Sequence, residues 1–419
     1  MSGFRTALRK LPPSTTIKIL RKVFSLPAPA ARLILNDVTR PRKSHRPWIH
    51  KVPWNKEWSG CWIGEEVSHL NQTALQERID QADIIFFYVH GGGFRVGSCT
   101  MYMDTYIGWL RLLKEKYGMK GMIMSVDYRL APEHKYPSPV EDVVRAYEHL
   151  IHTLGVDGSK IVVVGDSNGA SLVLEMLFIT HDPSMFEIVT DEGEQPEQLS
   201  ELPRPAGTIL ISPLVTDETD SESWKVNVKH DYISFYTARV IKRDYFEPPE
   251  QDSPDANQQV LGIAKLQTGF EAFLSSHVLM FVGNREVLRD DALDLAAKAE
   301  EDGVHWKTVV EDSVHNWFCV REVVKDNSIL ERGDQTFAEF CYRAVVSHRQ
   351  STIGSQRTPS VGLQAVPEDE EQEEEDDDDD EEFHEALTET DLDSTSTTAY
   401  DKLPGNEKTT KRKPLTVYV

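Results

Sequence analysis

The sequence predicts an α/β fold in which a mostly parallel sheet carries helices on both faces. From residue 52 to about 350, apolar strand-like runs alternate with helix-like segments. The strand-like runs lie at 84–89, 121–127, 160–165, 206–215, 277–283 and 304–310, and the helix-like segments lie at 103–117, 138–154, 169–180, 291–302 and 334–348. Such alternation joins parallel strands through right-handed helical crossovers. Two glycine-rich segments, each directly after a strand-like run, fit the same architecture.

One of these segments, Gly-Asp-Ser-Asn-Gly at 165–169, stands between the strand-like run 160–165 and the helix-like run 169–180. A serine on a sharp strand-to-helix turn needs a strained backbone, and flanking glycines remove side chains that would collide with the strand and the helix. This context is typical of a nucleophile elbow. We therefore predict Ser167 as the nucleophile of a serine hydrolase, with a chance occurrence of the short pattern as the alternative.

The other segment, His-Gly-Gly-Gly-Phe at 90–94, follows the strand-like run 84–89. Ester cleavage passes through a tetrahedral oxyanion, which preorganised main-chain N–H groups stabilise. We expect Gly92 and Gly93 to supply two such donors, and the amide of Asn168, directly after the serine, to supply a third. The alternative for the glycine run is an ordinary tight turn after a strand.

These motifs resemble those of the hormone-sensitive-lipase-like branch of the α/β-hydrolases, which carries His-Gly-Gly-Gly-Phe and Gly-Asp-Ser-x-Gly. The stretch Tyr-Arg-Leu-Ala-Pro-Glu-His-Lys-Tyr-Pro at 128–137 matches the segment that this family places between the two motifs. The resemblance covers about residues 80–320 and implies an α/β-hydrolase fold that cleaves esters. In its length and its basic N-terminal region the chain is also loosely similar to fungal steryl acetyl hydrolases.

A serine hydroxyl becomes a good nucleophile when a histidine takes its proton and an acid orients that histidine. In the α/β-hydrolase fold the acid and then the histidine follow the serine along the chain. His315, after the strand-like run 304–310, is the predicted base. The position at which the family carries aspartate holds Glu286, which is the first choice for the acid. Asp290, which we expect to begin the next helix, is the runner-up.

Composition divides the 419 residues into three predicted parts. Residues 1–51 form a basic amphipathic segment with twelve Lys or Arg and one acid. Residues 52–350 form the catalytic domain. Residues 351–419 form an acidic tail that we expect to be disordered, because the stretch 368–382 carries fourteen acids and few apolar groups follow it.

An insertion at about 216–275 interrupts the alternation and is predicted to form part of a cap, together with the N-terminal region. The insertion is rich in aromatic residues, and the N-terminal region adds Trp48, Trp54, Trp58 and Trp62. We expect these aromatic side chains to roof the nucleophile and to form an apolar pocket. The alternative is that they fill a small core of the cap itself.

Residues 14–26 predict a basic amphipathic helix, with Lys18, Arg21 and Lys22 opposite an apolar face. Such a helix is expected either to lie on an anionic membrane surface or to pack its apolar face on the cap. No apolar run is long enough to suggest a spanning helix, and no secretory leader is evident. We expect reduced cysteines and a cytoplasmic location, either free or peripheral on an organelle membrane such as the endoplasmic reticulum.

The predicted function is that of a serine carboxylic-ester hydrolase, which removes a small acyl group from a lipophilic ester of lipid or steryl type through an acyl-enzyme. Neither a cofactor nor a metal is expected, and the net charge of −24 argues against a nucleic-acid ligand. The sequence indicates no protein partner. The alternative is a catalytically inactive α/β-hydrolase-fold protein that acts as a binding or interaction module.

Overall fold

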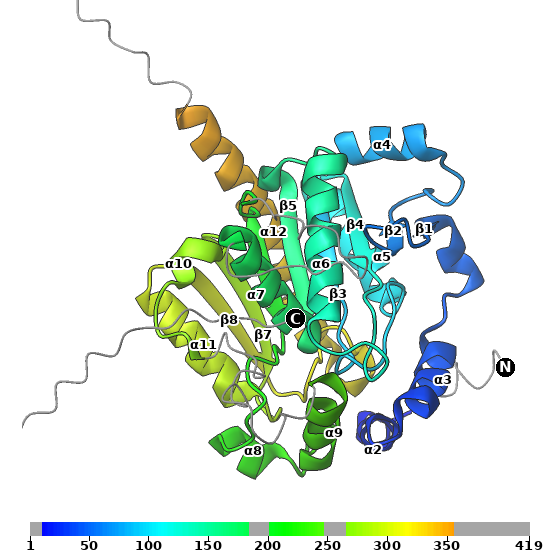
Figure 1. Ribbon diagram of the computed structural model, residues 1–419, viewed down its shortest axis with the longest axis vertical. Helices are drawn as coiled ribbons and strands as arrows, with labels where there is room; N and C mark the ends of the chain where they lie inside the picture. Colours follow the sequence, from blue (N-terminus) through cyan, green and yellow to red (C-terminus); the bar gives the residue numbers. More distant parts are fainter. Residues whose placement is uncertain (1–10, 184–200, 247–264, 356–419) are drawn as a thin grey trace, which may run out of the picture. The chain divides into compact units, whose positions relative to one another are not determined.

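The computed structural model describes residues 11–183, 201–246 and 265–355. Within this part of the chain an eight-stranded sheet has the order β1-β2-β4-β3-β5-β6-β7-β8 (Figure 1). Strands β3 to β8 run parallel, whereas β2 is antiparallel to both β1 and β4. The strands are β1 Ile49–Val52, β2 Gly60–Ile63, β3 Ile84–Val89, β4 Gly121–Val126, β5 Ile161–Asp166, β6 Gly207–Ile211, β7 His277–Gly283 and β8 His305–Glu311. The predicted α/β fold with a mostly parallel sheet is confirmed.

Helices cover both faces of this sheet (Figure 1). One face carries α5 and α12, and the other carries α6, α7 and α11. The helices are α2 Pro13–Phe24, α3 Ala28–Thr39, α4 Gln72–Asp80, α5 Met103–Tyr117, α6 Ser138–Glu148, α7 Asn168–His181, α8 Glu222–Asn227, α9 Phe235–Tyr245, α10 Phe270–Phe273, α11 Arg289–Glu301 and α12 Asn327–Ser355, with short helical turns at Lys43–Trp48, His149–Thr153, Gly158–Lys160 and Arg321–Val323.

Strand β3 shows how the sheet forms two cores. Ile85, Phe87 and Val89 belong to the core on one face, while the alternate residues of the strand belong to the core on the other face. Every residue of β3 is buried, because helices cover both sides of a parallel sheet. The continuous apolar runs of the sequence therefore reflect burial on both faces of the sheet. The site described below forms at the carboxyl ends of these strands.

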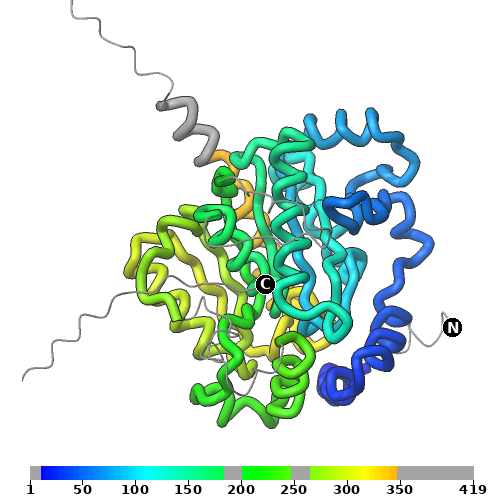
Figure 2. Tube along the Cα trace, viewed as in Figure 1, coloured from blue at the N-terminus to red at the C-terminus, as the bar shows by residue number. Residues whose placement is uncertain are grey.

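The N-terminal helices pack against the rest of the chain. Val23 of α2, Ala31 and Leu35 of α3, and Val96 of the loop after β3 form one buried cluster. Arg21 donates hydrogen bonds to main-chain carbonyls of the loop between α8 and α9, which Figure 2 shows beside α2. Of the two expectations for residues 14–26, the structure shows the one in which the apolar face packs on the cap. Contact of this helix with a membrane stays a prediction.

The structure shifts two of the predicted domain boundaries. Strand β1 crosses the predicted boundary at residue 51, so part of the N-terminal segment belongs to the sheet. Helix α12 continues to Ser355, beyond the predicted end of the catalytic domain at 350. The acidic tail lies outside the described residues from 356 onward. In the part of the chain that the structure describes, none of the helices has the length and apolar character needed to cross a membrane. The four cysteines are buried and unpaired.

Candidate active site

Ser167 occupies the turn between β5 and α7 with a φ of +53°. This left-handed backbone is uncommon for a residue with a side chain and marks local strain. A Cβ on Gly165 would lie 2.5 Å from the carbonyl oxygen of Gly169, and one on Gly169 would lie 2.2 Å from the carbonyl oxygen of Val89. Because both positions exclude any side chain, the turn has the nucleophile-elbow geometry that the sequence predicts.

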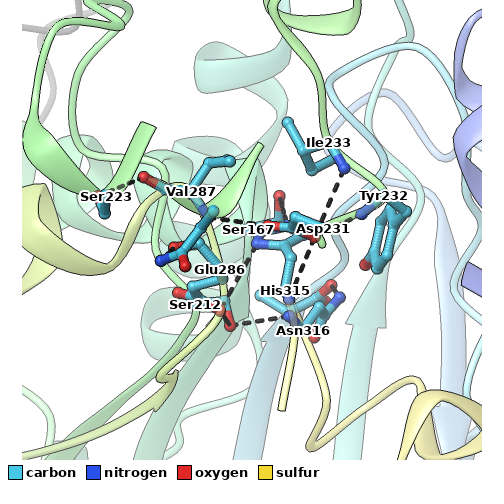
Figure 3. A network of polar contacts seen from close by, with 12 residues as sticks. Ser167, Ser212, Ser223, Asp231, Tyr232, Ile233, Glu286, Val287, His315 and Asn316 are labelled. Carbon is cyan, nitrogen blue, oxygen red and sulfur yellow. Dashed lines mark hydrogen bonds and ion pairs between the residues drawn. The ribbon is translucent and has the colours of Figure 1, made fainter. Parts of the chain in front are cut away.

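His315 lies in the loop after β8 and faces Ser167 (Figure 3). Its Nε2 is 2.9 Å from the Oγ of Ser167, which is the hydrogen bond that a general base needs with its nucleophile. The imidazole is 2% exposed, and burial lowers its pKa to about 3 because the protonated ring loses its hydration. The ring is therefore neutral near pH 7 and able to accept the proton of the serine.

Glu286 follows β7 and is buried next to His315. Its Oε2 lies 3.9 Å from the Nδ1 of His315, close enough for an ion pair but too far for a hydrogen bond. Neither that Nδ1 nor the Oε1 of Glu286 has a hydrogen-bond partner among the described residues. Burial raises the pKa of Glu286 to about 8, against the opposing effect of a hydrogen bond from Ser212. The structure thus brings all three predicted triad members together, with the acid slightly withdrawn.

The runner-up acid, Asp290, lies elsewhere. It is in the first turn of α11, as its sequence position predicts. Its Oδ2 accepts a hydrogen bond from the main-chain N–H of Ser223 at 2.7 Å, and its Oδ1 accepts one from the Nε of Arg289 at 2.8 Å. The first contact joins α11 to α8, the second lies within α11, and neither involves His315. The geometry therefore favours Glu286 as the acid.

The triple-glycine loop faces the elbow, with Gly92 and Gly93 both at positive φ. However, the N–H of Gly93 already donates a hydrogen bond of 2.7 Å to the Oδ1 of Asn168. The Nδ2 of Asn168 donates to the hydroxyl of Tyr128, which in turn donates to the carbonyl oxygen of His90. The expectation of three free oxyanion donors thus needs a correction, because the asparagine side chain occupies one of them. A substrate oxyanion has to share or replace that bond at Gly93.

A cavity of about 450 Å³ borders Ser167 and His315. Helices α2 and α3 contribute apolar side chains to its wall, and so does the cap segment that carries α8 and α9. Examples are Leu20 and Phe24 from α2, Leu35 from α3, and Trp224, Tyr232 and Ile241 from the cap. This volume is in the range of small-molecule sites. The site is thus a buried Ser-His-Glu arrangement that opens into an apolar pocket.

The sequence is similar to those of known hydrolases. Residues 86–319, more than half of the chain, match the model of the α/β hydrolase fold family. The chain belongs to the α/β hydrolase fold family. An esterase of Acinetobacter venetianus is 28% identical over 225 residues, which cover 53% of this chain and 64% of the relative. Lipase 2 of Moraxella sp. is 27% identical over 252 residues, which cover 57% and 54%, so this chain spans about half to two thirds of these curated relatives.

Solved structures agree with this assignment. An esterase from the bacterial hormone-sensitive lipase family superposes on this α/β hydrolase with a TM-score of 0.55 and 25% identity. The superposition covers 80% of this chain and 97% of that esterase. The predicted resemblance to hormone-sensitive-lipase-like α/β-hydrolases is confirmed.

This α/β hydrolase also uses polar residues that the sequence did not reveal as part of the site. Asp166 accepts hydrogen bonds from the N–H of Gly91 at 2.9 Å and from the Nδ2 of Asn316 at 2.6 Å. It thereby ties the elbow to the oxyanion loop and to the histidine loop. Ser212 donates to the Oε2 of Glu286 at 2.6 Å and accepts from the N–H of Asn316 at 2.8 Å. The glycine motif contains Asp166, but no local pattern marked Ser212.

The aromatic roof is formed differently from the prediction. Trp58 and Trp62 lie in the core on one face of the sheet, Trp48 lies in the core on the other face, and Trp54 is 56% exposed. None of these four side chains lines the cavity. The N-terminal region does contribute to the roof, but through Phe24 of α2 and through aliphatic side chains of α2 and α3. Tryptophans near β1 and β2 were misassigned because neither short strand was predicted.

Proposed function

We propose that this α/β hydrolase is a serine carboxylic-ester hydrolase that removes a small acyl group from a lipophilic ester. The hydrogen bond of 2.9 Å between His315 and Ser167 carries the proposal, because it joins a strained elbow serine to a neutral buried base. The names of the relatives, esterase and lipase, support ester cleavage as the reaction type. Steryl and other lipid esters are the substrate class that we favour.

The proposed reaction has two steps. His315 accepts the proton of Ser167 through Nε2 while the serine oxygen attacks the ester carbonyl, and the imidazolium then gives this proton to the departing alcohol. The main-chain N–H groups of Gly92 and Asn168, and that of Gly93 once Asn168 releases it, stabilise the oxyanion. A water molecule, activated by the same histidine, releases the acyl group from the serine. An ionised Glu286 stabilises the imidazolium formed in each step.

The size and the apolar wall of the pocket favour an ester whose alcohol is bulky and apolar. A cavity of about 450 Å³ exceeds what an acetyl group fills, and its wall is mainly aliphatic and aromatic. Helices α2 and α3 close this wall, so an extended hydrocarbon or ring system would be shielded from water by their apolar faces. Burial of such a group contributes to binding roughly in proportion to its apolar area, at about 25 cal/mol per Å².

A panel of acetate esters tests the proposal. We expect the wild-type protein to hydrolyse acetates of bulky apolar alcohols with a KM at least tenfold below that for ethyl acetate, because the pocket buries the alcohol. Lengthening the acyl group to palmitoyl on the same alcohol should lower kcat/KM. The Ser167→Ala variant should lose roughly 10³-fold or more in kcat. Equal turnover by wild type and Ser167→Ala would refute the serine mechanism, and no turnover by either would favour the non-catalytic binding module.

A further inference from the structure

The cap segment between α8 and α9 carries a buried carboxylate that lies against the catalytic turns. Asp231 is fully buried, yet it belongs to a loop rather than to the sheet. Its Oδ2 accepts a hydrogen bond from the N–H of Val287 at 2.9 Å, and its Oδ1 lies 3.4 Å from the N–H of His315 (Figure 3). Oδ1 also accepts from the N–H of Tyr232 at 2.7 Å. One side chain thus holds the main chain of two turns from different strands.

These two turns determine the geometry of the triad. Val287 directly follows Glu286, and the N–H that Asp231 holds in the other turn belongs to His315 itself. The relative position of the turns therefore sets the 3.9 Å separation between the acid and the imidazole. Reacting groups displaced by about 1 Å can lose about 10²-fold in rate. A carboxylate that fixes both turns acts on the reaction without contact with the substrate.

The same loop is held from outside by helix α2. The Nη1 of Arg21 donates hydrogen bonds to the carbonyl oxygens of Val228 and Asp231, at 2.7 and 3.1 Å. The ring of Tyr232 stacks on Phe24 of α2 at 5.7 Å and meets the imidazole of His315 edge-on at 5.5 Å. Helix α2 therefore contacts the Asp231 loop through both a guanidinium group and an aromatic ring.

We propose that Asp231 is a positioning residue of the ester-cleaving site, and that its buried carboxylate fixes through main-chain hydrogen bonds the turns that carry Glu286 and His315. This proposal rests on the proposed function of the site. Several N–H groups converge on the carboxylate, so an amide in its place would direct an NH₂ group at one of these donors. The carboxylate is thus required as an acceptor on both oxygens. Burial raises its pKa to about 7, and the N–H donors oppose that shift.

The test compares Asp231→Asn with Asp290→Asn. Asp290 also holds cap main chain through a carboxylate but does not contact the catalytic turns. We expect Asp231→Asn to lower kcat for an activated acetate by about 10–100-fold with KM changed less than about threefold. Asp290→Asn should stay within twofold of the wild type in both constants.

A double-mutant cycle separates positioning from a general loss of structure. In a Glu286→Gln background the triad is already broken, so adding Asp231→Asn should cost less than about threefold in kcat. An equal loss in both backgrounds, or a kcat of Asp231→Asn within twofold of the wild type, would overturn the proposal. Thermal unfolding of each variant shows whether it is folded.

If Asp231→Asn does not fold, Arg21→Ala decides the question. This variant removes the outer support of the loop and leaves the carboxylate in place, and Lys22→Ala on the exposed side of α2 is its control. We expect Arg21→Ala to lose about 3–10-fold in kcat, and a kcat equal to that of Lys22→Ala overturns the proposal. A wild-type protein without esterase activity would instead refute the proposed function, so the two failures are distinguishable.

Discussion

At the scale of single residues, the acid of the triad lies farther from the histidine than a hydrogen bond requires, with 3.9 Å between the Oε2 of Glu286 and the Nδ1 of His315. Glu286 and His315 are both buried, and burial shifts the pKa of each toward its uncharged form, to about 8 and about 3. The imidazole is therefore ready to accept a proton, whereas the carboxyl group is protonated below about pH 8. Since an ionised acid is needed to stabilise the imidazolium, this pair links activity to the titration of Glu286.

This link predicts the pH profile and identifies the acid. For the wild type, kcat/KM should rise as the pH increases through about 8, because a carboxyl group with a raised pKa becomes ionised only there. Glu286→Gln should lower kcat by roughly 10²–10⁴-fold and remove the part of this rise that lies near pH 8. Asp290→Asn should retain both the rate and the profile. Initial rates with an activated acetate from pH 5.5 to 9.5 check this prediction, and a profile of Glu286→Gln that matches the wild type would contradict it.

The residues that sequence alone revealed are those with a local signature. Ser167 was predictable because its turn requires two glycines nearby in sequence, and His315 because it follows the last strand. Ser212 and Asp231 carry no such signature. Their roles arise when loops after β6, in the cap, and after β7 and β8 converge, and only the folded chain shows that convergence. The Asn168 bond to Gly93 likewise depends on the approach of two loops.

At the scale of secondary-structure elements, α2 is a wall of the pocket. One side of the helix, including Leu20 and Phe24, borders the cavity, while Lys18 and Lys22 are exposed. The basic amphipathic pattern therefore arises because one face contacts the cavity beside Ser167 and the other contacts water. The hydrophobic pattern predicted the helix correctly, but it could not distinguish a pocket wall from a membrane-binding face, since both require the same periodicity.

A larger side chain in this wall should hinder esters of bulky alcohols more than ethyl acetate. Leu20→Trp places a larger ring at the cavity, so we expect the KM for a bulky alcohol acetate to rise about tenfold or more, while kcat/KM for ethyl acetate changes less than about twofold. Lys22→Trp adds the same ring to the exposed face and serves as the control. Steady-state kinetics with both esters measure the effect. If the two variants gave the same kinetics, α2 would not line the substrate site.

The elements that were predicted differ physically from those that were missed. The strands β3 to β8 were found within a few residues because they are apolar runs buried on both faces, and α5 was found with its bounds unchanged. The two antiparallel strands at Ile49–Val52 and Gly60–Ile63 were not found. Each has four residues, too few to show a period, and the pairing with β4 is a long-range contact.

At the scale of the whole molecule, buried acids make stability depend on pH. Burial raises the pKa of Glu175 to about 8, as it does for Glu286, and that of Asp231 to about 7. Through these three acids the native state binds more protons than the unfolded chain between about pH 4.5 and 8, which outweighs the one proton that His315 binds only in the unfolded chain. Their contribution to the free energy of unfolding is fully present below the unfolded pKa and is lost as the pH rises through the folded pKa. The protein should thus become less stable from pH 5 to 8.5.

Glu175 tests this dependence outside the active site. It lies in α7, and its Oε2 has no hydrogen-bond partner in the described part of the chain. Glu175→Gln removes the titration, so the melting temperatures of variant and wild type should diverge as the pH rises. At pH 7 the free energy of unfolding of Glu175→Gln should exceed that of the wild type by on the order of 3 kcal/mol. Glu77→Gln on the exposed face of α4 is the control. A difference that stayed constant from pH 5 to 8.5 would contradict the assignment of a neutral Glu175 whose Oε2 is buried.

The central claim is that Ser167 is a nucleophile activated by His315. Labelling with a fluorophosphonate, followed by mass spectrometry of the modified peptide, tests it most directly. We predict one adduct on Ser167 in the wild-type protein, and labelling slowed at least 100-fold in His315→Ala, because the hydroxyl then lacks its base. An unlabelled wild type, or an adduct formed equally fast in His315→Ala, would contradict the claim.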